Sequence, residues 1–333
     1  MYKKYFIIVL IIVLIGTIIF WLRDYLIQPK SEVEKVYKIG LLQMAPTVSE
    51  NIEGFKQGMS ELGYKEGVNV NYIYRDAKGD LELLKSYAQE LVDMKPDLIF
   101  VNTSPATDIL KQKTQDIPIV YSMVADPVKA GFVKTMKSSG NNLTGTSCAY
   151  IDMAPKRLQV LKEIDPLVKK VLIFYRPSDK SGGPAVEKIL EKAPEIGLKI
   201  ITVPINEKEE IHRYLNKLKK EDVDAIMDPA DAMVTAGLME WGVEKALELK
   251  IPLLMLSKRE AEKGALASFG VDYVDLGKQS SLIANQVLNG IPPSHIPSEY
   301  PRKFYFSINL ITANKIGLKI PNEVLQKADL IIK

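Results

Sequence analysis

The chain has 333 residues, enough for two ordinary domains, and its 47% hydrophobic and 26% charged content is typical of a globular protein. Its net charge is +3, and the first 30 residues, with four basic side chains and one acidic, carry all of that excess, so the remainder lacks the basic surplus of a nucleic-acid binder. A single cysteine, Cys148, excludes an intrachain disulfide, a cysteine-pair zinc site and an iron–sulfur cluster.

An uninterrupted apolar run, Tyr5–Leu22, contains no charged residue. Its length of about 27 Å as a helix is sufficient to cross the hydrocarbon core of a bilayer. Lys3 and Lys4 precede it, which places the N-terminus in the cytoplasm and the rest of the chain outside. The run therefore predicts a single-pass transmembrane anchor at the cell membrane with an extracytoplasmic body.

A cleaved signal peptide is the competing interpretation of this run. Signal peptides end in small residues, whereas this run ends in the bulky and charged sequence Phe20-Trp21-Leu22-Arg23, and no lipoprotein cysteine follows it. We favour the uncleaved anchor, with residues 1–35 forming a cytoplasmic stub, the transmembrane helix and a tether.

The body alternates short β-rich runs with amphipathic helical stretches. Strands are predicted at Lys38–Gln43, Val68–Tyr74, Asp97–Val101, Ile117–Val120, Lys170–Phe174, Leu198–Val203, Asp224–Met227, Pro252–Met255, Leu266–Phe269 and Lys303–Ile308. Helices are predicted between them, with the clearest at Asn51–Leu62, Leu81–Met94 and Asp272–Leu288. Such alternation indicates an α/β fold with parallel sheets.

The pattern restarts after Thr144-Gly145, which indicates two doubly wound parallel-sheet lobes rather than one wide sheet. The late strand and the helices after it suggest that the chain crosses between the lobes more than once. We expect lobe 1 to comprise residues 36–147 plus about 273–302, and lobe 2 to comprise residues 148–272 plus about 303–333.

Ligands of open α/β sheets bind beyond the carboxyl ends of the strands. One such loop runs into Ser104 and Pro105, which suit a helix start, and leaves the N–H groups of Ala106 and Thr107 available to an anion. Ser104 acting only as a helix cap explains the same residues equally well. The loop that contains Tyr175 and Ser178 lies at another strand end, in lobe 2.

Aspartates recur at strand ends, at Asp126, Asp231 and Asp272. Acidic groups beside helix N-termini would suit a zwitterionic ligand, but helix capping also places aspartates there. Both interpretations remain open.

No motif for catalysis is found: the sequence lacks G-x-S-x-G, a phosphate-binding G-x-x-x-x-G-K-[ST] loop and G-x-G-x-x-G after the first strand. His212 lies in a charged helical stretch and His295 in a proline-rich loop. We therefore expect no enzymatic activity, no cofactor and no metal site.

The body resembles the ABC-transporter substrate-binding proteins of the tryptophan/tyrosine type, which have the type I periplasmic-binding-protein fold. The resemblance covers about nine-tenths of the chain, and it rests on the order and spacing of several short motifs. These are Lys38–Gln43, Gly54-Phe55-Lys56-Gln57-Gly58 with Leu62-Gly63-Tyr64, Ser104-Pro105-Ala106, Asp116–Val120, Asp126-Pro127-Val128 with Ala130-Gly131, Asn142–Gly145, Gly270–Tyr273 with Leu276-Gly277, and Gly317–Pro321.

The resemblance implies a small amino-acid-like ligand, in several members aromatic, held between two lobes that close by a hinge, and an ABC permease as partner. Carried over by position, the implied ligand contacts divide into three groups. Ser104, Ala106 and Thr107 would hold an anionic group, Asp231 and Asp272 would face a cation, and Gln43, Asp126, Tyr175 and Ser178 would complete the cleft wall.

Three positions depart from the family pattern. Thr103 stands where the family usually has glycine, Ala125 where it often has threonine, and Ala232 where a polar asparagine is usual. The lipoprotein cysteine is also missing, which keeps a membrane-anchored sensory ectodomain without transport as the alternative function. The sequence identifies neither the ligand nor the oligomeric state.

Overall fold

The computed structural model describes residues 14–19, 21 and 35–333. Contacts divide the chain into two units, Met1–Val36 and Tyr37–Lys333. In the first unit, residues 14–19 and 21 are helical, and the rest of the predicted anchor and tether lies outside the described residues. Within the described ranges, no helix is both long enough and apolar enough to cross a membrane.

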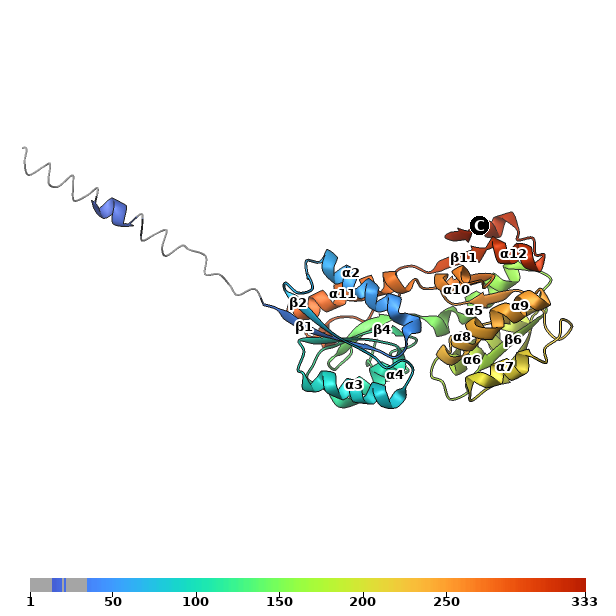
Figure 1. Ribbon diagram of the computed structural model, residues 1–333, viewed down its shortest axis with the longest axis horizontal. Helices are drawn as coiled ribbons and strands as arrows, with labels where there is room; N and C mark the ends of the chain where they lie inside the picture. The colour runs from blue at the N-terminus through green and yellow to red at the C-terminus, as the bar shows by residue number, and fades with distance from the viewer. Residues whose placement is uncertain (1–13, 20, 22–34) are drawn as a thin grey trace, which may run out of the picture. The chain divides into compact units, whose positions relative to one another are not determined.

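The second unit contains two sheets with helices packed on them (Figure 1). Its strands are β1 (Tyr37–Gln43), β2 (Val70–Asp76), β3 (Leu98–Asn102), β4 (Ile119–Val124), β5 (Leu143–Ser147), β6 (Lys170–Tyr175), β7 (Lys199–Pro204), β8 (Ala225–Met227), β9 (Leu253–Met255), β10 (Ala267–Gly270), β11 (Tyr305–Asn309) and β12 (Leu330–Ile332). The α-helices are α2 (Ser49–Glu61), α3 (Leu81–Asp93), α4 (Ser104–Lys113), α5 (Tyr150–Ile164), α6 (Gly182–Lys192), α7 (Lys208–Leu215), α8 (Ala232–Gly237), α9 (Val243–Leu249), α10 (Lys258–Glu262), α11 (Tyr273–Leu288), α12 (Leu310–Ile316) and α13 (Asn322–Leu325).

The first sheet has the order β2-β1-β3-β4-β5 and is parallel throughout. We call this sheet and the helices on it lobe 1. Helices α2 and α11 cover one face, and α3 and α4 cover the other (Figure 1). Phe55 of α2 stacks on Phe100 of β3 with ring centroids 3.9 Å apart, which joins helix and sheet in one apolar layer.

The second sheet has the order β12-β11-β10-β9-β8-β6-β7, and we call it with its helices lobe 2. Its pairs are parallel except β10 with β11, which is antiparallel. The expectation of purely parallel sheets is wrong at this pair. The reason is that β11 follows an extended segment from lobe 1, not a crossover helix that starts at the end of β10.

The chain passes between the lobes at three places. Strand β5 leads into α5, strand β10 leads into α11, and the segment before β11 returns to the second sheet. Helix α11 packs on α2 so closely that a Cβ on Gly54 would lie 2.1 Å from the carbonyl oxygen of Val274. Glycine at Gly54 therefore permits backbone contact between a lobe 1 helix and the start of α11.

Candidate functional site

A cleft of about 850 Å³ lies where the carboxyl ends of both sheets face each other. Lobe 1 contributes the residues after β1, β3 and β4, and lobe 2 contributes those after β6, β8 and β9. Ligands of parallel α/β sheets bind at this edge, and the volume is typical of a site for a small molecule.

Strained backbone gathers along the cleft. Thr103, Met123 and Ala230 all line it with positive φ angles of 75°, 57° and 80°, and Ala149, at the crossing from β5 to α5, has φ of 53°. Non-glycine residues adopt such angles at a cost of about 1–3 kcal/mol each and are concentrated at functional sites. Their concentration here makes this edge of the sheets a candidate binding site.

Replacing Thr103 by glycine is expected to raise the free energy of unfolding by about 1 kcal/mol, because relief of the strained angle exceeds the added flexibility of the unfolded chain. Urea unfolding of the full chain measures the change. Lys250→Gly is the control, because Lys250, with φ of 54° and ψ of 51°, lies in the ordinary left-handed region, whereas Thr103 combines φ of 75° with ψ of 150° outside it; the control should gain less stability than Thr103→Gly. A destabilised Thr103→Gly variant would contradict the strain assignment.

Buried polar atoms at the end of the lobe 1 strands lack protein partners. Both amide atoms of Gln43, the Oδ1 atoms of Asn51 and Asn102, and Oγ1 of Thr103 have no hydrogen bond within the described part of the chain. Buried polar groups are nearly always satisfied by protein, water or ligand. Their concentration beside the cleft indicates that a polar ligand or bound water completes this side.

Helix α4 presents its N-terminus to the cleft, as the sequence predicts. Ser104 and Pro105 line the cavity, and the N–H groups of Ser104 and Ala106 have no acceptor among the described residues. Thr107 is different, because its N–H and its hydroxyl both donate to the carbonyl oxygen of Thr103, at 3.1 and 2.8 Å.

Asp231 is fully buried and is paired inside lobe 2. Its carboxylate accepts from Arg176 Nη2 at 2.8 Å and from Arg176 Nε at 2.9 Å, and it caps α8 through the N–H of Met233 at 2.9 Å. Arg176 lines the cleft and also donates to Asp179 at 3.0 Å. The guanidinium therefore stands between Asp231 and the cavity.

Glu260 of α10 lines the cleft and is 5% exposed. Its Oε2 accepts from the N–H of Ser257 at 2.5 Å, completing the capping box that begins α10. Burial raises the pKa of this carboxyl to about 7, although the hydrogen bonds from Ser257 act in the opposite direction.

The pKa of Glu260 is about 7 in the folded protein, above its ordinary value of 4.5. The free energy of unfolding therefore falls as the pH rises from 4.5 to about 7. We therefore expect Glu260→Gln to gain stability relative to the wild type over this interval, and the gain to stay constant above it. Urea unfolding at about pH 5 and about pH 8 measures this difference. Parallel pH profiles of the two proteins would contradict it.

Aromatic and sulfur-containing side chains form the apolar part of the cleft. Tyr150 and Tyr273 begin α5 and α11, and their hydroxyl groups are 3.4 Å apart. Met123 enters from lobe 1 and Met239 from lobe 2, where Met239 belongs to a π-helical turn, Leu238–Gly242. Methionine side chains are flexible and make favourable contacts with aromatic rings. Turns of π-helix are frequent at functional sites.

Two contacts join the lobes across the mouth of the cleft. Arg259 Nη1 of α10 donates to the carbonyl oxygen of Thr47 at 2.5 Å and its Nε lies 3.7 Å from Glu50. Lys180 of lobe 2 lies 3.9 Å from Asp108 of α4. These contacts require the two lobes to be close together.

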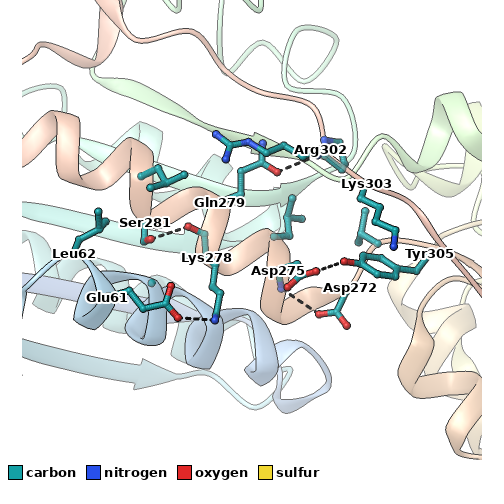
Figure 2. A pocket seen from close by; sticks show the side chains of 15 residues that line it. Glu61, Leu62, Asp272, Asp275, Lys278, Gln279, Ser281, Arg302, Lys303 and Tyr305 are labelled. Atoms are coloured by element: carbon teal, nitrogen blue, oxygen red, sulfur yellow. Dashed lines mark hydrogen bonds and ion pairs between the residues drawn. The ribbon is translucent and has the colours of Figure 1, made fainter. Parts of the chain in front are cut away.

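A separate pocket of about 360 Å³ lies beside α2 and α11 (Figure 2). Asp272 lines this pocket, not the cleft, and its carboxylate caps α11 by accepting from the N–H groups of Val274 and Asp275. Figure 2 also shows Asp275 accepting a hydrogen bond from the hydroxyl of Tyr305.

The structure brings together only some of the nine predicted site residues. Ser104 and Ser178 line the cleft directly, and Gln43, Ala106 and Thr107 are buried in lobe 1, at or just beyond the ends of its strands. Asp126 caps its own turn through the N–H groups of Val128 and Lys129, and Tyr175 ends β6, so neither is part of the cleft lining. Asp231 and Asp272 lie outside the lining, as described above.

Several side chains that line the cavity received no ligand role from the sequence. These are Tyr150, Arg176, Arg259, Glu260 and Tyr273. A capping-box pattern, with serine at Ser257 and glutamate three residues later, would have located the start of α10, but not the direction in which Glu260 points.

Comparisons with known proteins identify the family of the chain. A family model described as ABC transporter substrate binding protein matches residues 38–332. A tyrosine-binding protein of Clostridioides difficile (strain R20291) is 29% identical over 270 residues, which cover 80% of this chain and 77% of the relative.

Two solved structures of similar proteins superpose on this chain with different TM-scores. The structure of an ABC domain in complex with L-Trp from Streptococcus pneumonia is 28% identical, with a TM-score of 0.82 over 90% of this chain and 100% of that one. A ligand-free, open structure of a substrate binding protein with adhesive properties from Clostridium difficile is 29% identical over the same shares, with a TM-score of 0.70.

Proposed function

The chain belongs to the family of ABC transporter substrate-binding proteins, which bind solutes without transforming them, and we propose that its ligand is an aromatic amino acid held between the two lobes. The observation that carries this proposal is the cleft itself, because both lobes line it and it combines aromatic, methionine and buried polar side chains. Relatives named for tyrosine binding and for a complex with L-Trp support the ligand class.

The carboxylate and the aromatic ring of the proposed ligand both have counterparts in the cleft. The free N–H groups of Ser104 and Ala106 are suited to a carboxylate, as the resemblance implies for α4. Tyr150, Tyr273 and Met239 offer the apolar surface that an aromatic ring requires.

Closure of the lobes around the ligand is the proposed mechanism. A ligand favours the closed state only if it contacts both lobes at once, and the cleft lining allows this. The chain has a higher TM-score to the L-Trp complex than to the open, ligand-free structure, although the two are nearly equal in sequence identity. This difference supports a closed arrangement of the lobes. The contacts of Arg259 and Lys180 across the cleft support it as well.

We further propose that the body is extracytoplasmic, that residues 5–22 anchor it to the membrane, and that an ABC permease receives the closed form. The proposed lobe boundaries follow the three crossings, with residues 36–147 and about 273–302 in lobe 1 and the rest of the body in lobe 2. Mass spectrometry of the protein from its native membrane tests the anchor. A mature N-terminus near residue 30 would refute it.

Calorimetric titration of the purified full chain in mild detergent tests the ligand. L-tyrosine or L-tryptophan is expected to bind at least about tenfold more tightly than L-leucine, because the leucine side chain cannot fill an aromatic site. Tighter binding of L-leucine, or of a sugar, would refute the proposed ligand class.

A further inference from the structure

Four carboxylate side chains line the cleft, and three of them already have a cation. Asp108 lies 3.9 Å from Lys180, Asp179 lies 3.0 Å from Arg176, and Glu240 lies 2.7 Å from Lys208. Glu260 has no ion-pair partner within residues 35–333, although it is the most deeply buried of the four.

Two basic side chains close to Glu260 in the sequence also line the cleft, but neither forms an ion pair with it in the described part of the chain. Arg259 lowers the pKa of Glu260, yet its guanidinium contacts Thr47 and Glu50 across the cleft, and Lys263 is exposed to solvent. Tyr150 and Tyr273 lie near the carboxylate. Burial is the main cause that raises the pKa of each phenol, and the charge of Glu260 raises it further. Both phenols therefore stay neutral and offer hydrogen bonds but no compensating charge.

An unpaired buried carboxylate is costly unless a cation arrives, and such groups are concentrated at binding sites. Helix capping alone does not require the charge, because glutamine serves as well as glutamate at the third position of a capping box. A glutamate at this position thus calls for an explanation beyond the cap, and its side chain lines the cleft.

We propose that Glu260 binds the ammonium group of the ligand. The proposal rests on the proposed function and narrows it: the ligand must carry a protonated amine as well as an aromatic ring. It also replaces Asp231 in the role that the family resemblance implied, since the charge of Asp231 is already compensated by Arg176.

Three related ligands separate this contact from the rest of the site. L-tyrosine carries ammonium, carboxylate and ring, tyramine lacks the carboxylate, and 3-(4-hydroxyphenyl)propanoate lacks the ammonium. Calorimetry of the full chain in mild detergent should show that Glu260→Gln loses at least about tenfold in affinity for L-tyrosine and tyramine, and less than about threefold for 3-(4-hydroxyphenyl)propanoate.

Glutamine keeps the cap of α10, so the variant should fold. Glu262→Gln is the matched control, because Glu262 lies on the same helix, is exposed and forms an ion pair with Lys258 at 3.7 Å. This variant should bind all three ligands like the wild type. An equal loss for all three ligands, or no loss for any, in Glu260→Gln would overturn the ammonium contact alone. A wild-type protein that binds neither L-tyrosine nor L-tryptophan would instead refute the proposed function, and this inference with it.

Discussion

Replacing Asp231 by alanine is expected to lower the free energy of unfolding by at least about 3 kcal/mol, because it leaves the guanidinium of Arg176 without its main partner. The pair is bidentate, with Asp231 fully buried and the side chain of Arg176 27% exposed, and the same carboxylate caps α8. Loss of the cap contributes about 1 kcal/mol of the total. Urea unfolding of the full chain measures the change.

Asp272→Ala is the matched control for this prediction. Asp272 also caps a helix, accepting from Val274 N–H at 2.9 Å and Asp275 N–H at 3.1 Å, but it has no ion pair among the described residues. Its replacement should therefore cost about 1 kcal/mol. Equal losses in the two variants would show that the pair with Arg176 contributes nothing.

Replacing Gly54 by alanine is expected to cost about 3 kcal/mol, because the new methyl group has no space. A Cβ at Gly54 would lie 2.1 Å from the carbonyl oxygen of Val274, and one at Gly277 would lie 2.1 Å from that of Asn51, so the backbones of α2 and α11 must separate. Displacing α11 also moves Tyr273, its first residue, which lines the cleft. Ligand affinity should fall together with stability.

Gln57→Ala provides the comparison for Gly54→Ala. Gln57 lies on the exposed side of the same helix, so its replacement should change stability by less than about 0.5 kcal/mol. Unfolding in urea and calorimetry with L-tyrosine measure both variants. A Gly54→Ala protein as stable as Gln57→Ala would show that the two helices are free to move apart.

Most of the fold could be predicted from the sequence because each strand forms a short apolar run beside an amphipathic helix. The ten predicted strands all exist, with ends displaced by at most four residues. Strand β5, Leu143–Ser147, was missed because its sequence, LTGTS, is polar and contains glycine. Gly145 is needed there, since a Cβ would lie 2.0 Å from the carbonyl oxygen of Tyr121. Strand β12, Leu330–Ile332, is only three residues long and was also missed.

The position of the site could be predicted, but not the roles of its side chains. The rule that ligands bind beyond strand ends located the loops around Ser104 and Ser178, which line the cleft. It could not separate an aspartate that faces the ligand from one paired inside the protein. Asp231 meets Arg176, 55 residues away in the chain, and this contact exists only once β6 and β8 lie side by side.

The three positions that depart from the family pattern all line the cleft. Thr103 occupies a glycine position of the resembling family with a φ of 75°, and it brings a buried hydroxyl without a partner in the described structure. Ala125 and Ala232, which replace polar residues, both line the cavity. The two alanines make the lining of the cleft less polar, and we expect them to favour a ligand with a large apolar side chain.

Closure of the two lobes around an aromatic amino acid is the central proposal, and the distance between the lobes measures it directly. Spin labels at Lys113→Cys of α4 and Glu187→Cys of α6 would report it by pulsed electron resonance on the full chain, with Cys148, which lines the cleft, replaced by alanine so that only the two new sites are labelled. Saturating L-tyrosine is expected to replace a broad distribution of distances by one shorter, narrow distance. The same distribution with and without bound L-tyrosine would contradict the account.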